Sequence, residues 1–297
     1  FDESLCQQGK NFSNKVWNSF RLVKSWKVSD SIAQNDSSLT ATTWFENKFN
    51  SKLIEIDDHF NKYRISDALM TIYKLIWDDF CSWYLEMIKP AYGEKIDLET
   101  YNQTLILLKK CLIILHPFMP FISEEIWSGI KNENDDPIII SDWPTSKKID
   151  HSILDSFDHI SQLITNVRKY RNEKGISYKE KLELFSVVNQ NSKMKSVVLK
   201  LSNSDLSDDF SSKSENVHSI IVGSIEYFIN NLSNQEEDLD KVKEDLDYNL
   251  SFLKSIQSKL SNQRFVDNAP EDIIKNERKK EEDTLKKIKM IELKLKK

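Results

Sequence analysis

The chain has 297 residues, of which 39% are hydrophobic and 30% are charged, and its formal net charge is -5 at pH 7. This length allows two or three domains with a hydrophobic core, and the composition excludes a disordered chain. The net acidity excludes a protein that binds nucleic acid through its overall charge, so any RNA contact has to come from local patches of cations.

The counts of individual residue types further limit the fold class and the kinds of functional site. Only 5 glycines and 6 prolines predict long helices with few tight turns. The cysteines Cys6, Cys81 and Cys111 show no metal-ligand spacing and are interpreted as thiols in the reducing cytoplasm. The histidines form no metal or nucleophile motif, no apolar run is long enough to span a membrane, and no signal peptide is visible. We therefore expect no metal site, no catalytic residue and no membrane contact in this chain.

Apolar residues recur at helical spacing through the first 148 residues. The predicted helices are Asp2–Lys27, Thr43–Tyr63, Tyr63–Lys89, Asp97–Leu115 and a fifth that begins at Pro120. A polar loop is expected from Val28 to Leu39, and a short extended segment from Ile138 to Pro144. The aromatic cluster around Phe80 and Tyr84 is interpreted as core.

An apolar corner joins the fourth and fifth helices at His116-Pro117. Proline has no backbone N–H and disfavours helical geometry in the residue before it, so the helix should stop or kink there. Pro120 suits the first turn of the next helix. Taken alone, this corner is a structural element with no chemistry.

Residues 149–234 predict a small α/β subdomain. It comprises a helix over Leu154–Lys174 with Gly175 as its C-cap, a strand over Leu182–Val188, a helix over Lys193–Leu201, and one or two strands within Val217–Ile229. Ser202 to Glu215 is interpreted as a loop. The cations near the end of the first helix, such as Arg168, are explained by the helix dipole. The pattern indicates no chemical role beyond that of a spacer.

A heptad pattern begins near residue 235. Its seam is formed by Leu239, Val242, Leu246, Asn249, Leu253, Ile256 and Leu260. A break at Ser261–Pro270 precedes a second, lysine-rich helix with a seam of Ile274, Leu285, Ile288, Ile291 and Leu295. Two such helices joined by a short loop predict an antiparallel coiled-coil hairpin.

Four segments carry a resemblance to a known family. LHPFMPFISEEIW, at the corner, resembles the hallmark of the anticodon-binding helical domain of class I aminoacyl-tRNA synthetases for Val, Ile, Leu and Met. FSNKVWNSFRLV and WDDFCSWYLEMIKP resemble the first and central helices of that domain. RFVDNAPEDIIKNERKK resembles the turn and return helix of the arm of valyl-tRNA synthetases. The chain is similar, over nearly its whole length, to the C-terminal part of a bacterial valyl-tRNA synthetase.

The resemblance implies a mainly α chain of three parts. These are an anticodon-binding helical bundle (1–148), a small α/β linker subdomain (149–234) and a coiled-coil tRNA-binding arm (235–297). The intact enzyme would attach L-valine to its tRNA with ATP and Mg, through valyl-adenylate. Both class I ATP signatures, of the His-Ile-Gly-His and Lys-Met-Ser-Lys-Ser type, are absent from this sequence. We therefore expect a catalytic half before Phe1, and a chain that binds tRNA as a monomer without activating an amino acid.

The resemblance also implies contact residues. Lys15, Asn18 and Arg21 lie in the matching first helix, together with Lys10 and Asn14, and are interpreted as contacts to anticodon bases and phosphates. The predicted phosphate contacts of the arm are Arg264, Lys275, Arg278 and Lys279. The alternative for both sets is a solvated helix face with local salt bridges.

Two rival functions remain open. The first is the same region of another class I synthetase, most closely isoleucyl; the absence of a four-cysteine zinc module favours the valyl family. The second is a non-catalytic scaffold whose coiled coil binds protein. The intramolecular break at Ser261–Pro270 counts against it, whereas the acidic start of the first arm helix weakens the case for RNA contact there.

Overall fold

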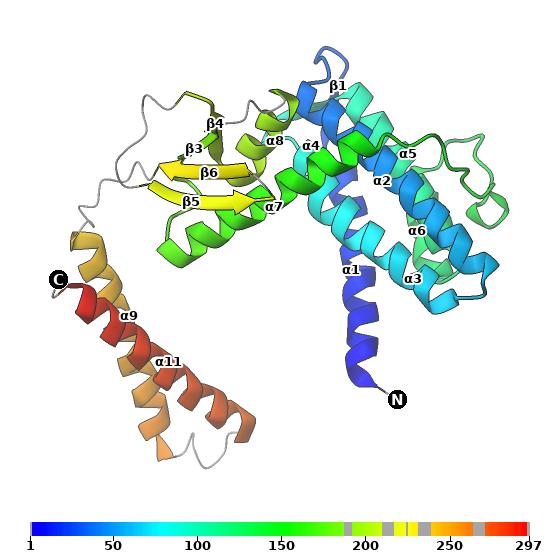
Figure 1. Cartoon of the computed structure of the whole chain (residues 1–297). Coiled ribbons are helices and arrows are strands. Elements are labelled where there is room, and N and C mark those ends of the chain that lie inside the picture. The colour runs from blue at the N-terminus through cyan, green and yellow to red at the C-terminus, as the bar shows by residue number, and fades with distance from the viewer. Residues whose placement is uncertain are drawn as a thin grey trace. The chain divides into compact units, whose positions relative to one another are not determined.

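The computed structural model describes residues 2–186, 192–209, 217–223, 225–230, 239–263 and 271–295. The chain forms two compact units, Phe1–Asn230 and Asn231–Lys297, and its helices dominate both (Figure 1). The predicted mainly α architecture is confirmed. None of the described helices has the length and apolar character needed to cross a membrane. The predicted boundary at residue 148 lies inside the first unit and stays a prediction.

The first unit opens with a helical bundle. Its helical elements are α1 (Glu3–Ser25), α2 (Asp36–Asn61), α3 (Ile65–Lys74), η1 (Leu75–Tyr84), α4 (Leu85–Ile88), α5 (Leu98–Leu115) and α6 (Pro120–Ile130). Side chains cap three of them: Asp2, Asn35 and Asp97 each accept a hydrogen bond from a backbone N–H two or three residues later. The cap at Asn35 explains why α2 begins seven residues before the predicted Thr43, inside a stretch expected to be a loop.

The middle of the third predicted helix is a π-helix. Segment η1 joins α3 and α4 into one continuous helical run, and its wider turns place Ser82 Oγ 2.8 Å from the carbonyl oxygen of Trp77, five residues earlier. Such segments occur often at functional sites. Here the π-helix also directs Phe80 and Tyr84 into the core, where Phe45 packs against both rings at centroid distances of 5.3 and 5.2 Å.

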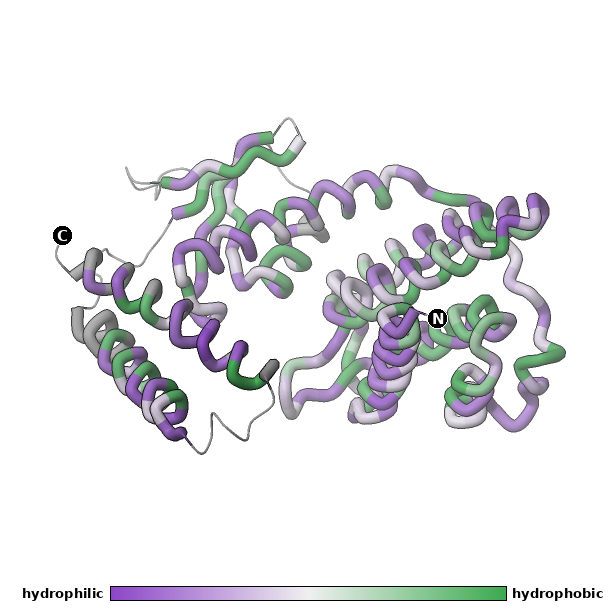
Figure 2. The backbone as a smooth tube through the Cα atoms, turned by 90° about the horizontal axis from the view of Figure 1, so that it is seen from below, coloured by the Kyte–Doolittle hydropathy of each residue, from purple (hydrophilic) through white to green (hydrophobic). Residues whose placement is uncertain are grey.

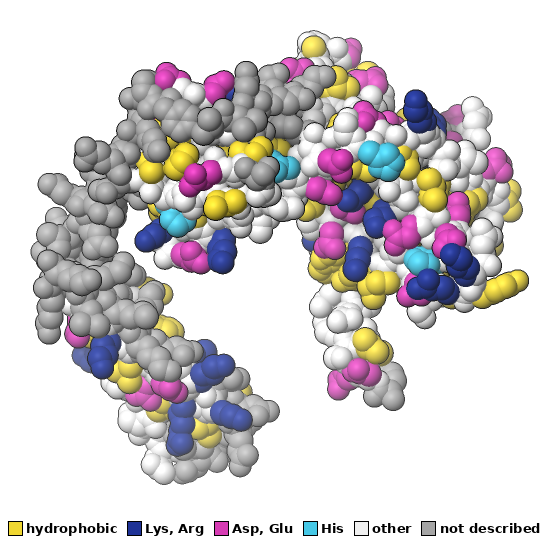
Figure 3. All heavy atoms as spheres, viewed as in Figure 1, with side chains coloured by type: hydrophobic (Ala, Val, Ile, Leu, Met, Phe, Trp, Pro, Cys, Tyr) yellow, Lys and Arg dark blue, Asp and Glu magenta, His cyan; other side chains and the backbone are white. Residues whose placement is uncertain are grey.

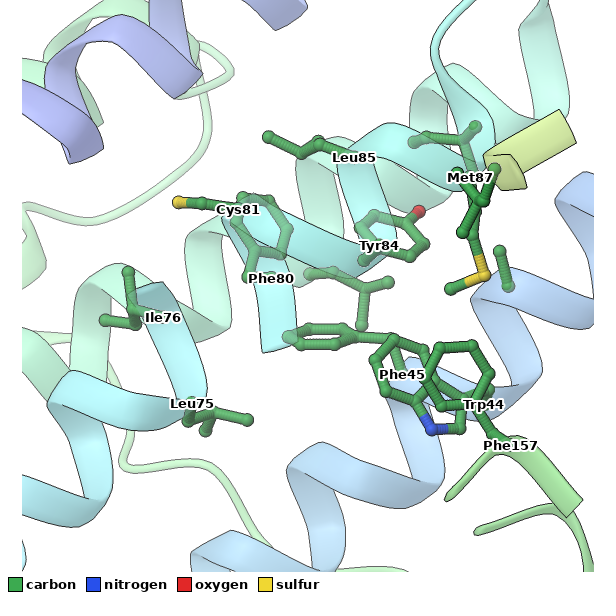
Figure 4. Close-up of a cluster of buried hydrophobic side chains, with 14 of the residues drawn as sticks. Trp44, Phe45, Leu75, Ile76, Phe80, Cys81, Tyr84, Leu85, Met87 and Phe157 are labelled. Carbon is green, nitrogen blue, oxygen red and sulfur yellow. The ribbon is translucent and has the colours of Figure 1, made fainter. Parts of the chain in front are cut away.

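One hydrophobic core extends from the bundle into the rest of the first unit (Figure 4). Trp44 of α2 stacks on Phe157 of α7 (His151–Lys174), with ring centroids 3.9 Å apart. Phe157 in turn meets the edge of Trp83, so the aromatic cluster predicted as core on the third helix is confirmed.

The apolar corner forms as predicted. Helix α5 ends at Leu115, α6 begins at Pro120, and Nδ1 of His116 lies 2.8 Å from Oγ of Ser123, which links the two helices. Helix α6 then passes close to α1 at Gly129. A Cβ atom at this position would lie 2.7 Å from the Phe20 ring. A larger residue at this position would require the Phe20 ring to move.

Two short pieces of the bundle differ from the prediction. Strands β1 (Lys27–Ser29) and β2 (Lys95–Asp97) form a parallel pair between segments expected to be loops. Ile138–Ile140 forms one turn of 3-10 helix, η2, where an extended segment was predicted; only Ile138 of this turn is buried. A run of three isoleucines has strand character by composition, but in this turn two of them face solvent.

A four-stranded sheet completes the first unit. Its elements are β3 (Leu182–Ser186), α8 (Ser192–Ser202), β4 (Ser204–Ser207), β5 (Val217–Val222) and β6 (Ile225–Asn230), in the strand order β4-β3-β6-β5. Strands β3 and β4 are parallel, joined across α8, and the other pairs are antiparallel. Helix α7 packs against β5 and β6, with His159 Nε2 2.7 Å from Tyr227 Oη, and ends at Gly175 with φ 66° as predicted. The loop predicted from residue 202 is wrong where β4 forms.

The second unit contains α9 (Leu239–Ser261) and α11 (Glu271–Leu295) packed side by side. Gln257 bonds Glu281, and Lys259 pairs with Glu277, so the two helices run antiparallel, as predicted. Hydrophilic and hydrophobic residues alternate along both helices (Figure 2). Asn249 and Ile256 are buried in the predicted seam. On α11, Thr284 is buried and Leu285 is 48% exposed, so the predicted seam is wrong by one residue there.

A partly buried carboxyl group on η1, that of Asp79, gives a stability prediction. Burial raises the pKa of Asp79 to about 6, Asp78 and Asp158 add to the shift, and Lys48 and Lys52 oppose it. Because the folded pKa exceeds the ordinary value of 3.8, the folded chain should lose stability as pH rises through 6. Asp79→Asn should therefore raise the free energy of unfolding by ~1–3 kcal/mol at about pH 7.5.

Urea unfolding at several pH values checks this expectation. The gain should shrink as pH falls from 6 toward 3.8 and vanish at lower pH, where both the folded and the unfolded chain bind the proton. Asp78→Asn, at the exposed neighbouring position, should change stability by less than ~0.5 kcal/mol. A gain of the same size at about pH 4.5 and pH 7.5 would contradict the account.

Candidate nucleic-acid interface

An open pocket lies between α1 and the η1–α4 segment, and we call it the α1 pocket. Three asparagines of α1 contribute to it together with Lys15, and Leu22 and Leu85 supply apolar surface. The full lining is Asn11, Asn14, Lys15, Asn18, Ser19, Leu22, Cys81, Leu85 and Glu86. The residues of α1 in this set recur every three or four positions, so they share one helix face.

Lys15 is held in place by the π-helix. Its Nζ donates to Ser82 Oγ at 2.8 Å and lies 4.4 Å from the centre of the Trp77 ring. The same Trp77 ring stacks on Tyr73, which stacks on Phe12 of α1. The ammonium group therefore has a fixed position at the pocket wall, which lowers the entropy lost when it pairs with an anion.

Asn18 and Arg21, the other two predicted contacts on α1, differ in their position relative to the α1 pocket. Asn18 is exposed and lines the α1 pocket beside Lys15. Arg21 is exposed but lies outside the pocket lining. The structure thus brings two of the three predicted residues together, and their roles in binding stay predictions.

Cys81 contributes surface to the pocket without reactivity. It accepts a hydrogen bond from Ser19 Oγ at 3.0 Å, and burial raises the pKa of its thiol to about 11. A thiol in this state is neither a good nucleophile nor a metal ligand. Throughout the described ranges, no group of three or more His, Cys, Asp and Glu side chains is arranged to hold a metal ion.

The groups in the α1 pocket suit single-stranded RNA. Amide side chains can pair with base edges, aliphatic side chains can pack on base faces, and one ammonium group can neutralise a phosphate. The pocket contains one carboxylate, Glu86, which is bound to Lys89 at 2.6 Å. An unpaired carboxylate facing RNA would oppose binding, and this ion pair reduces that opposition.

The lysine-rich helix α11 carries a second set of predicted contacts. Lys275, Arg278 and Lys279 are exposed at positions i, i+3 and i+4 and therefore share one helix face. Lys and Arg side chains gather along the described part of this helix pair (Figure 3). Within that part, the three cations make no ion pair, whereas Lys280 is bound to Glu277 at 2.7 Å and lowers its pKa. Arg264, the fourth predicted contact, lies outside the described residues.

A further pocket was not predicted from the sequence. It is lined by Glu86, Lys89, Pro90, Ala91, Arg168, Asn172, Tyr178, Lys200 and Leu201, and we call it the α4–α8 pocket. Its cations come from three elements more than thirty residues apart along the chain, so no local pattern signals it. Arg168, explained from sequence by the helix dipole, instead donates two hydrogen bonds to the carbonyl oxygen of Leu201, at 3.2 and 2.8 Å.

Comparison with known proteins covers both units. Residues 42–186 match the family model described as the anticodon-binding domain of tRNA ligase. Residues 231–297 match the model described as the valyl tRNA synthetase tRNA binding arm. The two matches follow the order that the sequence resemblance implies.

Two similar proteins illustrate the relationship of the whole chain to known proteins. The chain is 44% identical to a valine–tRNA ligase of Christiangramia forsetii, over 100% of this chain and 34% of that protein. It is 42% identical to the valine–tRNA ligase of Parabacteroides distasonis, over 98% of this chain and 34% of that protein. The chain thus spans about a third of the length of the curated relatives it matches. The chain belongs to the valyl-tRNA synthetase family, in which it corresponds to the C-terminal region of anticodon-binding domain and tRNA-binding arm.

Proposed function

We propose that this chain recognises valine tRNA for a cytoplasmic, monomeric valine–tRNA ligase. The helical bundle binds the anticodon through the α1 pocket, and the helix pair α9–α11 binds the outer corner of the tRNA. Binding energy from both regions then orients the acceptor end toward a distant catalytic site. The observations that support this most directly are an asparagine-rich pocket on the bundle and, on α11, an exposed face of cations that make no ion pair with the described residues.

In this proposal, the intact protein attaches L-valine to tRNA with ATP and Mg, through valyl-adenylate. The residues of the present chain do not fit ATP. The five glycines are scattered, the class I ATP signatures are missing, and the described residues include no cluster suited to a divalent cation. We therefore assign this chain a positioning role and no chemical step.

Two observations favour this proposal over its rivals. Valine is the amino acid in the names of the similar proteins, which favours a valyl over an isoleucyl enzyme. Contacts between α9 and α11 bury residues such as Ile256 and Ile288 within one chain. A scaffold that paired its helices with those of another molecule through this seam would need the same surface.

Two substitutions in the α1 pocket test the anticodon role. Asn18→Ala should weaken binding of a valine anticodon stem-loop by about 5- to 30-fold, because it removes a neutral hydrogen-bonding group of ~1–2 kcal/mol. Lys15→Gln should weaken binding and also lower the slope of log K against log salt by ~0.7, the value for one phosphate contact on a single strand. Fluorescence anisotropy at about 50 and 200 mM salt measures both effects.

Matched controls lie on exposed helix and loop positions away from the pocket. Asn102→Ala on α5 and Lys131→Gln after α6 remove the same groups, and each should bind within twofold of the parent chain. If the parent chain binds the stem-loop and both pocket variants bind equally well, the α1 pocket does not hold the anticodon.

A further inference from the structure

The α4–α8 pocket is the strongest feature that the proposed function leaves unused. Its wall combines Lys89 after α4, Arg168 and Asn172 of α7, Tyr178, and Lys200 of α8. Glu86 is the carboxylate in the lining, and its bond to Lys89 balances one of the three positive charges. The pocket therefore has a net positive charge.

The cations in this pocket differ in mobility. The guanidinium of Arg168 is fixed by its two bonds to Leu201 and lies 5.7 Å from the Trp83 ring. Lys89 and Lys200 are on separate parts of the chain, and their side chains are more adaptable than the fixed guanidinium, although Lys89 is paired with Glu86 in the free chain. One ammonium group paired with Glu86, a second on α8 and one fixed guanidinium form an arrangement suited to a phosphate.

Lys89 and Lys200 affect each other in the free chain. Desolvation, followed by the charge of Lys89, lowers the pKa of Lys200 to about 8, while Glu86 and Glu94 oppose the shift. The positive charge on Lys200 is therefore partly disfavoured without a counterion. An anion between the two ammonium groups would remove this repulsion.

An aromatic face lies at the same place. The Tyr178 ring is 53% exposed, and its hydroxyl donates to the carbonyl oxygen of Lys200 at 3.4 Å. An exposed ring beside cations is typical of surfaces on which the bases of single-stranded nucleic acid stack. The amide of Asn172 adds a group that can pair with a base edge or a ribose hydroxyl.

The position of the pocket connects it to the α1 pocket. Glu86 lines both, so the two pockets meet on either side of this residue. This shared wall places the α4–α8 pocket next to an RNA strand held in the α1 pocket. Resting on the proposed function, we infer that Lys89 and Lys200 bind a phosphodiester of the RNA strand adjoining the nucleotides in the α1 pocket, with Tyr178 against a neighbouring base.

Substitution of the two lysines tests this inference in the full 297-residue chain. Lys89→Gln and Lys200→Gln should each weaken binding of the valine anticodon stem-loop by about 3- to 10-fold, and the double variant by about 10- to 30-fold. The double variant should also lower the salt slope by about 1.4, the value for two contacts on a single strand. Lys169→Gln, at a 73% exposed position on α7 outside the pocket, is the matched control and should bind within twofold of the parent.

Substitutions of Tyr178 and the pH dependence of RNA affinity test the inference independently. Tyr178→Ala should weaken binding about fivefold or more, and Tyr178→Phe, which keeps the ring, should bind like the parent. Because a bound phosphate favours the protonated form of Lys200, affinity should fall as pH rises from about 7 to 9. Lys200→Gln should flatten this dependence. Circular dichroism confirms that each variant folds.

The possible results distinguish a failure of the pocket inference from a failure of the proposed function. If the double lysine variant binds like the parent while Asn18→Ala loses affinity, the α4–α8 pocket does not contact RNA and the proposed function stands. If the parent chain does not bind the stem-loop even at low salt, both the pocket inference and the anticodon proposal are wrong.

Discussion

Replacing Phe45 with alanine should lower the free energy of unfolding of the first unit by about 3–5 kcal/mol. Phe45 is 0% exposed, and its ring contacts Trp44, Phe80 and Tyr84 at centroid distances of 6.0, 5.3 and 5.2 Å. The substitution removes a large apolar group and leaves a cavity between α2 and η1 that rigid neighbouring rings cannot fill. Urea unfolding followed by circular dichroism and tryptophan fluorescence measures the loss.

Phe121 provides the matched control for this prediction. The same substitution there removes a ring that is 91% exposed, so Phe121→Ala should change the free energy of unfolding by less than ~0.5 kcal/mol. Equal losses at the two positions would show that the aromatic cluster around Phe45 is not the centre of the core.

Charge reversal on α11 should have the largest effect on tRNA binding. The double variant Arg278→Glu with Lys279→Glu should weaken binding of full-length valine tRNA by about 10- to 100-fold and lower the salt slope by ~2, because two duplex phosphate contacts are lost. Both residues are exposed on one helix face and make no ion pair within the described part of the arm. Anisotropy measured at several salt concentrations gives the affinity and the slope together.

A second pair of neighbouring lysines controls for the change in net charge. Lys147 and Lys148 are exposed in the segment before α7, and reversing both changes the net charge by the same amount. That variant should bind within about threefold of the parent. If neither the affinity nor the salt slope changes in the α11 variant, the assignment of the arm to tRNA is wrong.

Local signals in the sequence predicted the parts of the fold that depend on neighbouring residues. Pro117 and Pro120 ended one helix and began the next, and Gly175 closed α7. These residues act through their own backbone geometry, so their effect is visible without knowledge of the tertiary structure. The heptad pattern predicted α9 and α11 for the same reason, because its period reports one helix face.

Elements that depend on distant partners were missed. Strand β4 has only four residues, two of them serine, and it is stabilised by parallel pairing with β3 across α8. Strands β1 and β2 pair across almost seventy residues. Short polar segments of this kind carry too weak a pattern to be recognised as strands before their partners are known.

The residues of the candidate site also fall into those that the sequence predicts and those that depend on the tertiary structure. Lys15 and Asn18 could be predicted because they share one helix face and a family resemblance. The anchoring of Lys15 by Ser82, and the convergence of Lys89 and Lys200, depend on a π-helical turn and on tertiary packing. Neither can be read from the spacing of residues along the chain.

Binding of the chain to purified valine and isoleucine tRNAs, at about 50 and 200 mM salt, tests the central claim most directly. The account predicts salt-sensitive binding to both through the phosphate contacts, with tighter binding of valine tRNA through the α1 pocket. Equal affinity for the two tRNAs would contradict anticodon recognition by the bundle. No binding of either by the folded chain at low salt would contradict the account as a whole.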